Sequence, residues 1–455
     1  MTGLLIKNFV RSKGLMTGLL LLFLSGLISL NVGKHFLEKN QQLIQQTAHF
    51  QQENIDRNVK YVNKEIGLLL YYVRFGLANH TPNLAGLSIG QRDINPAVLS
   101  VTIRNLEEQK YTTDLMNPMY QLIGNLDFSF VLIYFFPLII IAFCFNLISE
   151  EKEEGTWSLV LSQAISPLKM LRLKLCIRYV SVLTVLLLLL VIAKFYLAIP
   201  VDNAFVAFGL TAILYISFWF SVSWLIVSFH RDSSYNALLL LIVWVMLTIV
   251  IPASVTTVIV YKYPVPEAFG TVLESRDGYH SKWDQPKEPT IQKFQKHYPQ
   301  FNRYKHPEGK DYSWLWYYAM QQMGDDEAAV HATDLKTKLR KREAASSVIG
   351  LFVPTIHTQQ ICNHLSQSDM ANHLNFIEEV EKFHEQKRLY FYPKIFTDFA
   401  IADENWKAFP LAYFQDKVSV NWSLVLIPVF SICVICVVWA GVNFRRPLER
   451  NARYE

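Results

Sequence analysis

Residues 128–174 read FSFVLIYFFPLIIIAFCFNLIS followed by EEKEEGTWSLVLSQAISPLKMLRLK, and this stretch decides how the rest of the chain is interpreted. Its first part is predominantly apolar over about 20 residues, the length that an α-helix needs to cross about 30 Å of hydrocarbon. Its second part opens with a group of carboxylates and leads into another apolar run. The pattern predicts two membrane-spanning helices joined by a short charged turn.

The composition extends this prediction to the whole chain. Of 455 residues, 51% are hydrophobic and only 18% are charged, which is typical of an integral membrane protein. Apolar runs long enough to span a bilayer lie at 14–33, 128–149, 175–199, 204–229, 237–260 and 422–444. The first run is longer than a signal-peptide core and lacks a small-residue cleavage site, so we expect a retained anchor. The expected fold is all-α, with six transmembrane helices.

Basic residues predict how these helices are oriented. They flank the short connections on one side of the membrane: Lys7, Arg11, Lys13, Lys169, Arg172, Lys174, Arg231, Arg445, Arg446, Arg450 and Arg453. The positive-inside rule then places both termini, the segment 150–174 and the tail 445–455 in the cytoplasm. These clusters account for the net charge of +5, so we expect no nucleic-acid partner.

Two long connections, 34–127 and 261–421, then face outward as extracytoplasmic insertions. The first carries an apolar stripe at helical spacing (Ile55, Val59, Val62, Ile66, Leu69, Val73), which predicts a helix ending near Gly76. No proline or other helix-breaking sequence separates this helix from the first span, so the two can form one continuous helix. Such a helix could transmit motion to the first insertion or could serve only as a packing surface, and we favour the packing role.

The second insertion is expected to be helical from about Tyr312. Ser368 and Asp369 are N-cap candidates for a later helix, whose buried stripe would be Leu374, Ile377, Val380 and Phe383.

The chain lacks the sequence motifs of the common classes of enzyme. There is no phosphate-binding G-x-x-x-x-G-K-[ST] loop and no zinc-peptidase, acyl-hydrolase or paired-cysteine signature, so we expect no enzyme and no bound cofactor. Four of the five cysteines lie in spans, which leaves no disulfide within the insertions. Cys362, His364, Met370 and His373 are close in sequence, but their spacing matches no metal site, and we prefer a solvated helical surface.

Charges at membrane depth are almost lacking as well. Arg178 and Lys194 are expected near the ends of the third span, where they can snorkel, and Asp127 and Asp202 at outer boundaries. An ion-coupled carrier usually needs an ionisable group deep in the membrane, so the energy source should lie outside this chain. The polar residues within the spans are better explained as ties between helices. A route through such apolar and aromatic helices would suit a lipid-like or amphipathic substrate.

The charged turn carries a resemblance to a known family. Glu151, Glu153, Glu154, Gly155, Thr156, Leu159, Leu161 and Ser162, followed by Pro167, resemble the segment shared by ABC-2 type transporter permeases. The resemblance implies a coupling helix that docks on a separate ATPase subunit, present in two copies, which binds ATP and Mg²⁺. It also implies pairing with a second permease, either another copy or a homologue. Family members often carry proline where this chain has Ala164.

The resemblance covers nearly the whole chain. Residues 82–93, 124–128 and 370–380 look like a bacterial subgroup with two large extracytoplasmic insertions, and residues 1–13 look like its amphipathic elbow helix. By resemblance, the protein is a permease subunit of the bacterial inner membrane that exports a lipid-like, amphipathic or peptide substrate. The alternative is a mechanotransmission subunit that moves its outer domains to act on an envelope partner without transport.

Overall fold

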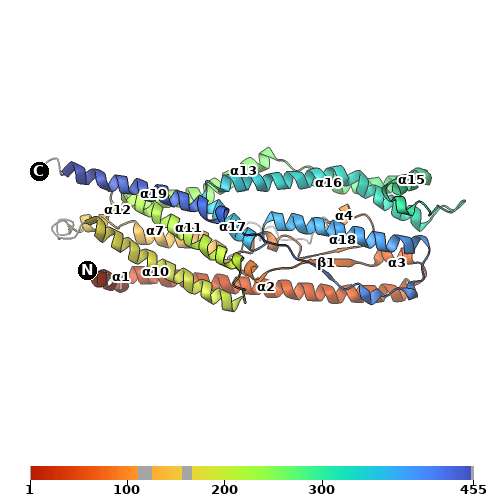
Figure 1. Ribbon diagram of the computed structural model, residues 1–455, viewed down its shortest axis with the longest axis horizontal. Helices are drawn as coiled ribbons and strands as arrows, with labels where there is room; N and C mark the ends of the chain where they lie inside the picture. The colour runs from red at the N-terminus through yellow and green to blue at the C-terminus, as the bar shows by residue number, and fades with distance from the viewer. Residues whose placement is uncertain (1, 111–124, 156–166, 452–455) are drawn as a thin grey trace.

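The computed structural model describes residues 2–110, 125–155 and 167–451. The molecule is elongated, and both chain termini lie at the same end (Figure 1). We call this the terminal end. The opposite, distal end is built from the two segments that connect the first span to the second and the fifth to the sixth.

Within the described residues, six helices are long and apolar enough to cross a membrane, as the sequence predicts. The short helix α1 (Thr2–Arg11) precedes them. Four of the spans are single helices: the first is α2 (Lys13–Tyr61), the third α10 (Pro167–Tyr196), the fourth α11 (Asn203–Val227), and the sixth is Trp422–Phe444 of α19 (Trp422–Asn451). The second span, Phe128–Glu153, is composed of α6 (Phe128–Phe130), η3 (Val131–Phe135), α7 (Phe136–Cys144) and α8 (Ser149–Glu153), and the fifth, Ser233–Lys262, of α12 (Ser233–Val245), η4 (Met246–Val250) and α13 (Ile251–Lys262). The turns η3 and η4 are π-helical. Helix length and composition therefore define a mostly helical, multi-pass membrane protein.

In the described residues, the two long connections contain short elements and helices of up to 37 residues. The first has α3 (Ile66–Tyr72), β1 (Phe75–Asn79), η1 (Asn83–Gly86), η2 (Gly90–Asp93), β2 (Val98–Val101) and α4 (Glu107–Lys110). The second has α14 (Glu267–His280), η5 (Ser281–Asp284), α15 (Lys287–His297), η6 (Pro299–Phe301), α16 (Trp314–Gly350), α17 (Pro354–Leu365), α18 (Met370–Phe396), η7 (Ile401–Asp403), η8 (Trp406–Ala408) and β3 (Ala412–Phe414).

Helix α2 runs without a break from the terminal end into the distal region (Figure 1). Its 49 residues span about 74 Å at 1.5 Å per residue, more than twice the thickness of a bilayer core. The predicted continuous helix is therefore present, but the predicted end near Gly76 is wrong. The helix stops at Tyr61, because Val62 leaves the helical conformation (φ −115°, ψ 61°), and Gly76 lies in β1.

The distal region contains a three-stranded sheet, so the expectation of an all-α fold is wrong there. The strand order is β2-β1-β3, with β1 antiparallel to β2 (Leu77 opposite Leu99) and parallel to β3 (Leu77 beside Ala412). Because β3 belongs to the second insertion, the sheet joins both insertions. Every residue of β1 is buried, so the strand lacks the alternation of polar and apolar residues that identifies an exposed strand.

The partly buried Arg92 and the buried Arg388 also join the insertions. Arg92 donates hydrogen bonds to the Thr81 hydroxyl and, across the insertions, to the Gln367 carbonyl, both at 2.7 Å. Arg388 on α18 donates to the Arg104 carbonyl and to Asp325 of α16, also at 2.7 Å each. Burial lowers the pKa of Arg92 to about 10, so it is still charged at neutral pH.

The buried apolar residues form two cores, one among the spans and one in the distal region. Helix α17 lies within the second connection, yet its Cys362 and Leu365 belong to the core of the spans. The Thr355 hydroxyl donates to the Leu247 carbonyl of η4 at 2.5 Å, and His357 Nε2 lies 3.0 Å from the Leu424 carbonyl of α19. This helix therefore packs directly against the spans.

Several local predictions for the second insertion are confirmed. Helix α16 begins at Trp314, close to the predicted position, but α14 and α15 precede it, so the expectation that helical structure begins only near Tyr312 is wrong. Asp369 caps α18 by accepting a hydrogen bond from the Asn372 amide at 3.0 Å. The predicted stripe, represented by Leu374 and Val380, is buried in α18.

Candidate functional site at the terminal end

The acidic turn lies at the terminal end (Figure 1), beside α1 and residues 174–178 of α10. Helix α8 ends at Glu153, and Gly155 follows with φ +74°, in the left-handed region that only glycine adopts without strain. A Cβ at Gly155 would meet no atom of the described residues within 4 Å. The backbone conformation, rather than space, therefore explains glycine at the predicted reversal.

Two of the predicted carboxylates hold this turn against neighbouring spans. Glu151 pairs with Lys174 of α10 at 2.5 Å, and both side chains are largely buried. Glu153 accepts hydrogen bonds from the backbone amide and the hydroxyl of Ser233, at 2.8 and 3.0 Å, at the start of α12. The Ser149 and Ser233 hydroxyls also lie 2.5 Å apart. A displacement of α8 would therefore act on the third and fifth spans.

Glu154 is exposed, as Glu153 is, but it differs from Glu151 and Glu153 in its contacts. Among the described residues, its carboxylate has no hydrogen-bond or ion-pair partner. It lines a cavity of about 290 Å³ between α1, α8 and α10, together with Glu150 and Glu151. Lys174 and Arg178 also line this cavity, and Lys174 pairs with Glu151, so Glu154 is the carboxylate best placed to attract a cation from outside the chain.

The remaining predicted residues are Thr156, Leu159, Leu161, Ser162 and Pro167. The first four lie outside the described residues. Pro167 is the first residue of α10, a position where its missing N–H breaks no helical hydrogen bond.

Arg178 is the residue whose role the sequence did not predict correctly. It was expected to snorkel toward the interface, but only 8% of its surface is exposed and its guanidinium donates a hydrogen bond to the Phe143 carbonyl. That carbonyl lies in the last turn of α7, where helical partners run out. Asn236 similarly donates to the Phe145 carbonyl at 3.2 Å. The sequence signal that could have indicated this buried contact is a single arginine within an otherwise apolar part of the third span.

The connection between the fourth and fifth spans also contacts this face. The Ser228 hydroxyl accepts a hydrogen bond from Asn443 of α19 at 3.1 Å. Burial, and then the nearby charge of Lys152, lower the pKa of His230, so its ring is neutral at pH 7. The connection between the fourth and fifth spans therefore contacts the last span through Ser228 and lies near Lys152 of the acidic turn through His230.

The histidine- and cysteine-containing segment lies far from this site. Cys362 is buried in the core of the spans, and His364 pairs with Asp369 at 2.9 Å. Across residues 2–110, 125–155 and 167–451, no three His, Cys, Asp or Glu residues are arranged to hold a metal ion, and the cysteines are free thiols.

Comparison with known proteins adds one match. Residues 268–414 match DUF3526, a domain of unknown function, and cover most of the connection between the fifth and sixth spans. No curated protein matches the chain. The structure and this match together describe a multi-pass membrane protein that carries a DUF3526 segment between its last two spans.

Proposed function

We propose that this protein is an ABC-2 type permease subunit, driven by a separate ATPase that docks on residues 150–167. The observation that carries the proposal is the anchoring of the acidic turn: Glu151 is paired with Lys174 of α10, and Glu153 is bonded to Ser233 of α12. The described part of this segment lies at the end that holds both termini, which would be the cytoplasmic face. The chain would pair with a second permease and work in the bacterial inner membrane.

The anchors suggest how ATP energy would enter the spans. ATP binding would draw two ATPase subunits together and displace α8. The Glu151–Lys174 ion pair would carry this movement to α10, and the Glu153–Ser233 hydrogen bonds would carry it to α12. The helix bundle would then alternate between its two sides and export an amphipathic, lipid-like or peptide substrate. ATP and Mg²⁺ would remain on the partner, so this chain itself would catalyse no reaction.

A second candidate function is mechanotransmission, in which the distal region acts on an envelope partner and nothing crosses the membrane. The observation that favours it is the continuous α2, which reaches the distal core through the buried side chain of Gln51. Gln51 donates to the Phe409 carbonyl at 2.9 Å and accepts from the Gly76 amide at 2.7 Å. A helix fixed at both ends can move the distal region rigidly.

The coupling assignment can be tested by separating docking from transmission. Glu154→Lys reverses the exposed carboxylate, and we expect less ATPase to copurify with the full-length chain. Glu151→Gln removes an internal ion pair, and we expect normal ATPase binding with reduced ATP-dependent transport. Asp334→Lys on α16 makes the same charge reversal on an exposed site away from the terminal end and serves as the control. Unchanged binding and transport in both test variants would refute docking at this segment.

The two candidate functions give different results with the same reconstituted complex. Spin labels at the distal end and the terminal end would report ATP-dependent motion in either case. Transport of a labelled amphipathic substrate would occur only for an exporter. Motion without transport, across a panel of such substrates, would favour mechanotransmission.

A further inference from the structure

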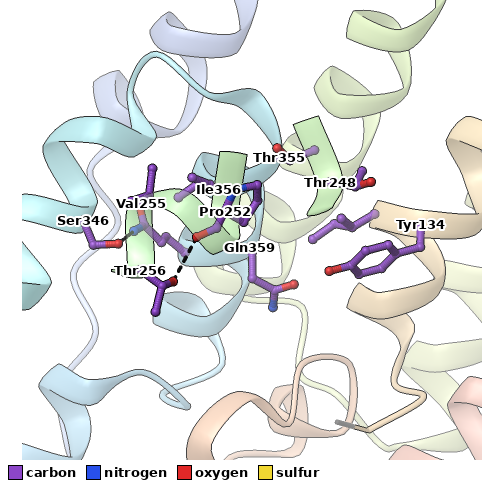
Figure 2. A pocket seen from close by; sticks show the side chains of 11 residues that line it. Tyr134, Thr248, Pro252, Val255, Thr256, Ser346, Thr355, Ile356 and Gln359 are labelled. Carbon is purple, nitrogen blue, oxygen red and sulfur yellow. Dashed lines mark hydrogen bonds between the residues drawn. The ribbon is translucent and has the colours of Figure 1, made fainter. Parts of the chain in front are cut away.

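A cavity of about 210 Å³ lies where the second and fifth spans meet α17 and the end of α16 (Figure 2). Ile133, Pro252 and Ile356 give it apolar walls, whereas Tyr134, Thr256 and Gln359 place polar groups at its surface. None of the described residues that line it is charged. The cavity is thus suited to an uncharged molecule that is partly polar.

Both spans change their backbone geometry at this cavity. The second span forms the π-helical turn η3 before Pro137, and the fifth forms η4 before Pro252. Each proline lacks an N–H group, which leaves carbonyls of the preceding turn without a helical donor. Tyr215 donates instead to the Ile133 carbonyl at 3.1 Å, and Thr355 to the Leu247 carbonyl. Side chains from α11 and α17 therefore stabilise these turns, and π-helical turns are frequent at functional sites.

Most polar groups around the cavity already have partners within the protein. The Thr256 hydroxyl donates to the Pro252 carbonyl at 3.0 Å, as the dashed line in Figure 2 shows. Gln360 donates to the Ser346 hydroxyl at 2.7 Å. The Gln359 amide nitrogen donates to Asn363 at 2.8 Å. These bonds fix the walls and leave few groups for a ligand.

Some polar lining groups remain, including the Gln360 carbonyl oxygen, and two of them face each other. The Tyr134 hydroxyl and the Gln359 carbonyl oxygen have no hydrogen-bond partner among the described residues. Figure 2 shows the ends of these side chains pointing toward one another at the cavity. The hydroxyl can donate a hydrogen bond and the amide oxygen can only accept one. A matching ligand therefore offers an acceptor and a donor close together.

The surface beside the cavity is apolar and exposed. Phe135 on the second span and Ile249 and Val250 on the fifth adjoin the lining residues in sequence, with 40%, 51% and 40% of their surfaces exposed. They lie within membrane-spanning segments, so hydrocarbon can cover them. A ligand with a small polar part and an acyl chain would satisfy both the cavity and this surface. A charged headgroup would lose its hydration there without gaining a counter-charge.

We propose that this cavity binds the uncharged glycerol-ester part of a neutral lipid of the diacylglycerol class. Tyr134 donates to the ester carbonyl, Gln359 accepts from the free hydroxyl, and an acyl chain extends along Phe135 and Ile249. Lipid binding at this site requires no ATPase, so it can be tested independently of the proposal that an ATPase docks on residues 150–167. If the protein is an exporter, the site indicates the chemical class of its substrate.

Photolabelling of the full-length chain in phosphatidylcholine nanodiscs tests this site. The probes are a diacylglycerol and a phosphatidylglycerol that carry the same diazirine-bearing acyl chain, so that only the polar parts differ. We expect the diacylglycerol to label residues 131–137 or 248–256 about fivefold more strongly than the phosphatidylglycerol does, as one or two hydrogen bonds would produce. Tyr134→Phe and Gln359→Leu should each reduce this labelling about threefold or more.

Thr257→Val is the matched control, because its hydroxyl bonds its own helix as that of Thr256 does but lies outside the cavity lining. Tyr134→Phe removes a single oxygen atom, so it keeps the test informative if Gln359→Leu does not fold. Equal labelling by the two probes, or labelling that neither variant reduces, would show only general contact with membrane lipid and would overturn the proposal.

Discussion

The spans and the distal region are stabilised in different ways. The core of the spans is a continuous set of apolar side chains, and its buried Arg178 contacts a backbone carbonyl. The distal region adds to its apolar core buried ionic contacts that join distant parts of the chain, such as Arg388 with Asp325 and Lys110 with Glu381. Apolar contacts can hold helices that already lie side by side in a membrane, whereas two long insertions need directional contacts to select one arrangement.

The largest effect is expected from breaking a buried ionic contact in the distal region. Arg388→Leu leaves Asp325 buried without its partner, and the Ile103 and Arg104 carbonyls lose a donor. Removing one member of a buried pair costs about 3–5 kcal/mol. Hydrogen–deuterium exchange on the full-length chain in nanodiscs should show lower protection in α18 and β2, with little change in α10.

Arg340→Leu is the control for this change, because Arg340 and its partner Glu378 are both substantially exposed. A surface pair contributes at most about 1 kcal/mol, so protection should barely change. Equal losses in the two variants would mean that burial does not distinguish these ion pairs, and the contrast between the regions would fail.

The boundary between the two regions should depend on pH. Burial raises the pKa of Asp127 to about 6, compared with an ordinary value of 3.8. The folded state therefore binds this proton more tightly than the unfolded state does. The resulting stabilisation is complete below about pH 3.8 and is lost as pH rises through about 6, a change of about 3 kcal/mol.

Asp127→Asn should remove this pH dependence while keeping an oxygen that can accept from the Phe130 amide. The measurement is the difference in unfolding free energy between variant and wild type at pH 4 and at pH 7. The variant should gain relative stability at the higher pH. A difference that does not change with pH would show that Asp127 titrates normally.

Local sequence signals predict the spans and the ends of helices, but not contacts between the insertions. Apolar length alone locates the six spans, and the side chain of Asp369 reveals the start of α18. β1 escapes prediction because its two partners lie in different insertions and both its faces are buried. At the candidate site, Gly155 is predictable from its turn, whereas the partners of Glu153 depend on how α8 meets α12.

A close backbone contact also joins the two regions, where α2 crosses η1. A Cβ at Gly33 would lie 1.9 Å from the Gly86 carbonyl oxygen, so Gly33→Ala must displace one of the two backbones. We expect a cost of about 1–3 kcal/mol and faster exchange around η1. Gly14→Ala lies in the same helix with no atom within 4 Å and should be neutral or slightly stabilising. Similar effects of the two changes would exclude this contact as a constraint.

The smallest effect concerns a helix cap at the edge of the spans. Asp202 accepts a hydrogen bond from the Phe205 amide at 2.9 Å, and Asp202→Ala should cost about 1 kcal/mol. Asp369 caps α18 in the same way but also bonds His364, so Asp369→Ala should cost more in the distal region. Serine at either position can retain the cap but not the histidine pair. Serine should therefore restore most of the stability at 202 and less at 369, as measured by thermal unfolding. Equal rescue at both positions would show that the histidine pair adds nothing, and that the two regions cap their helices alike.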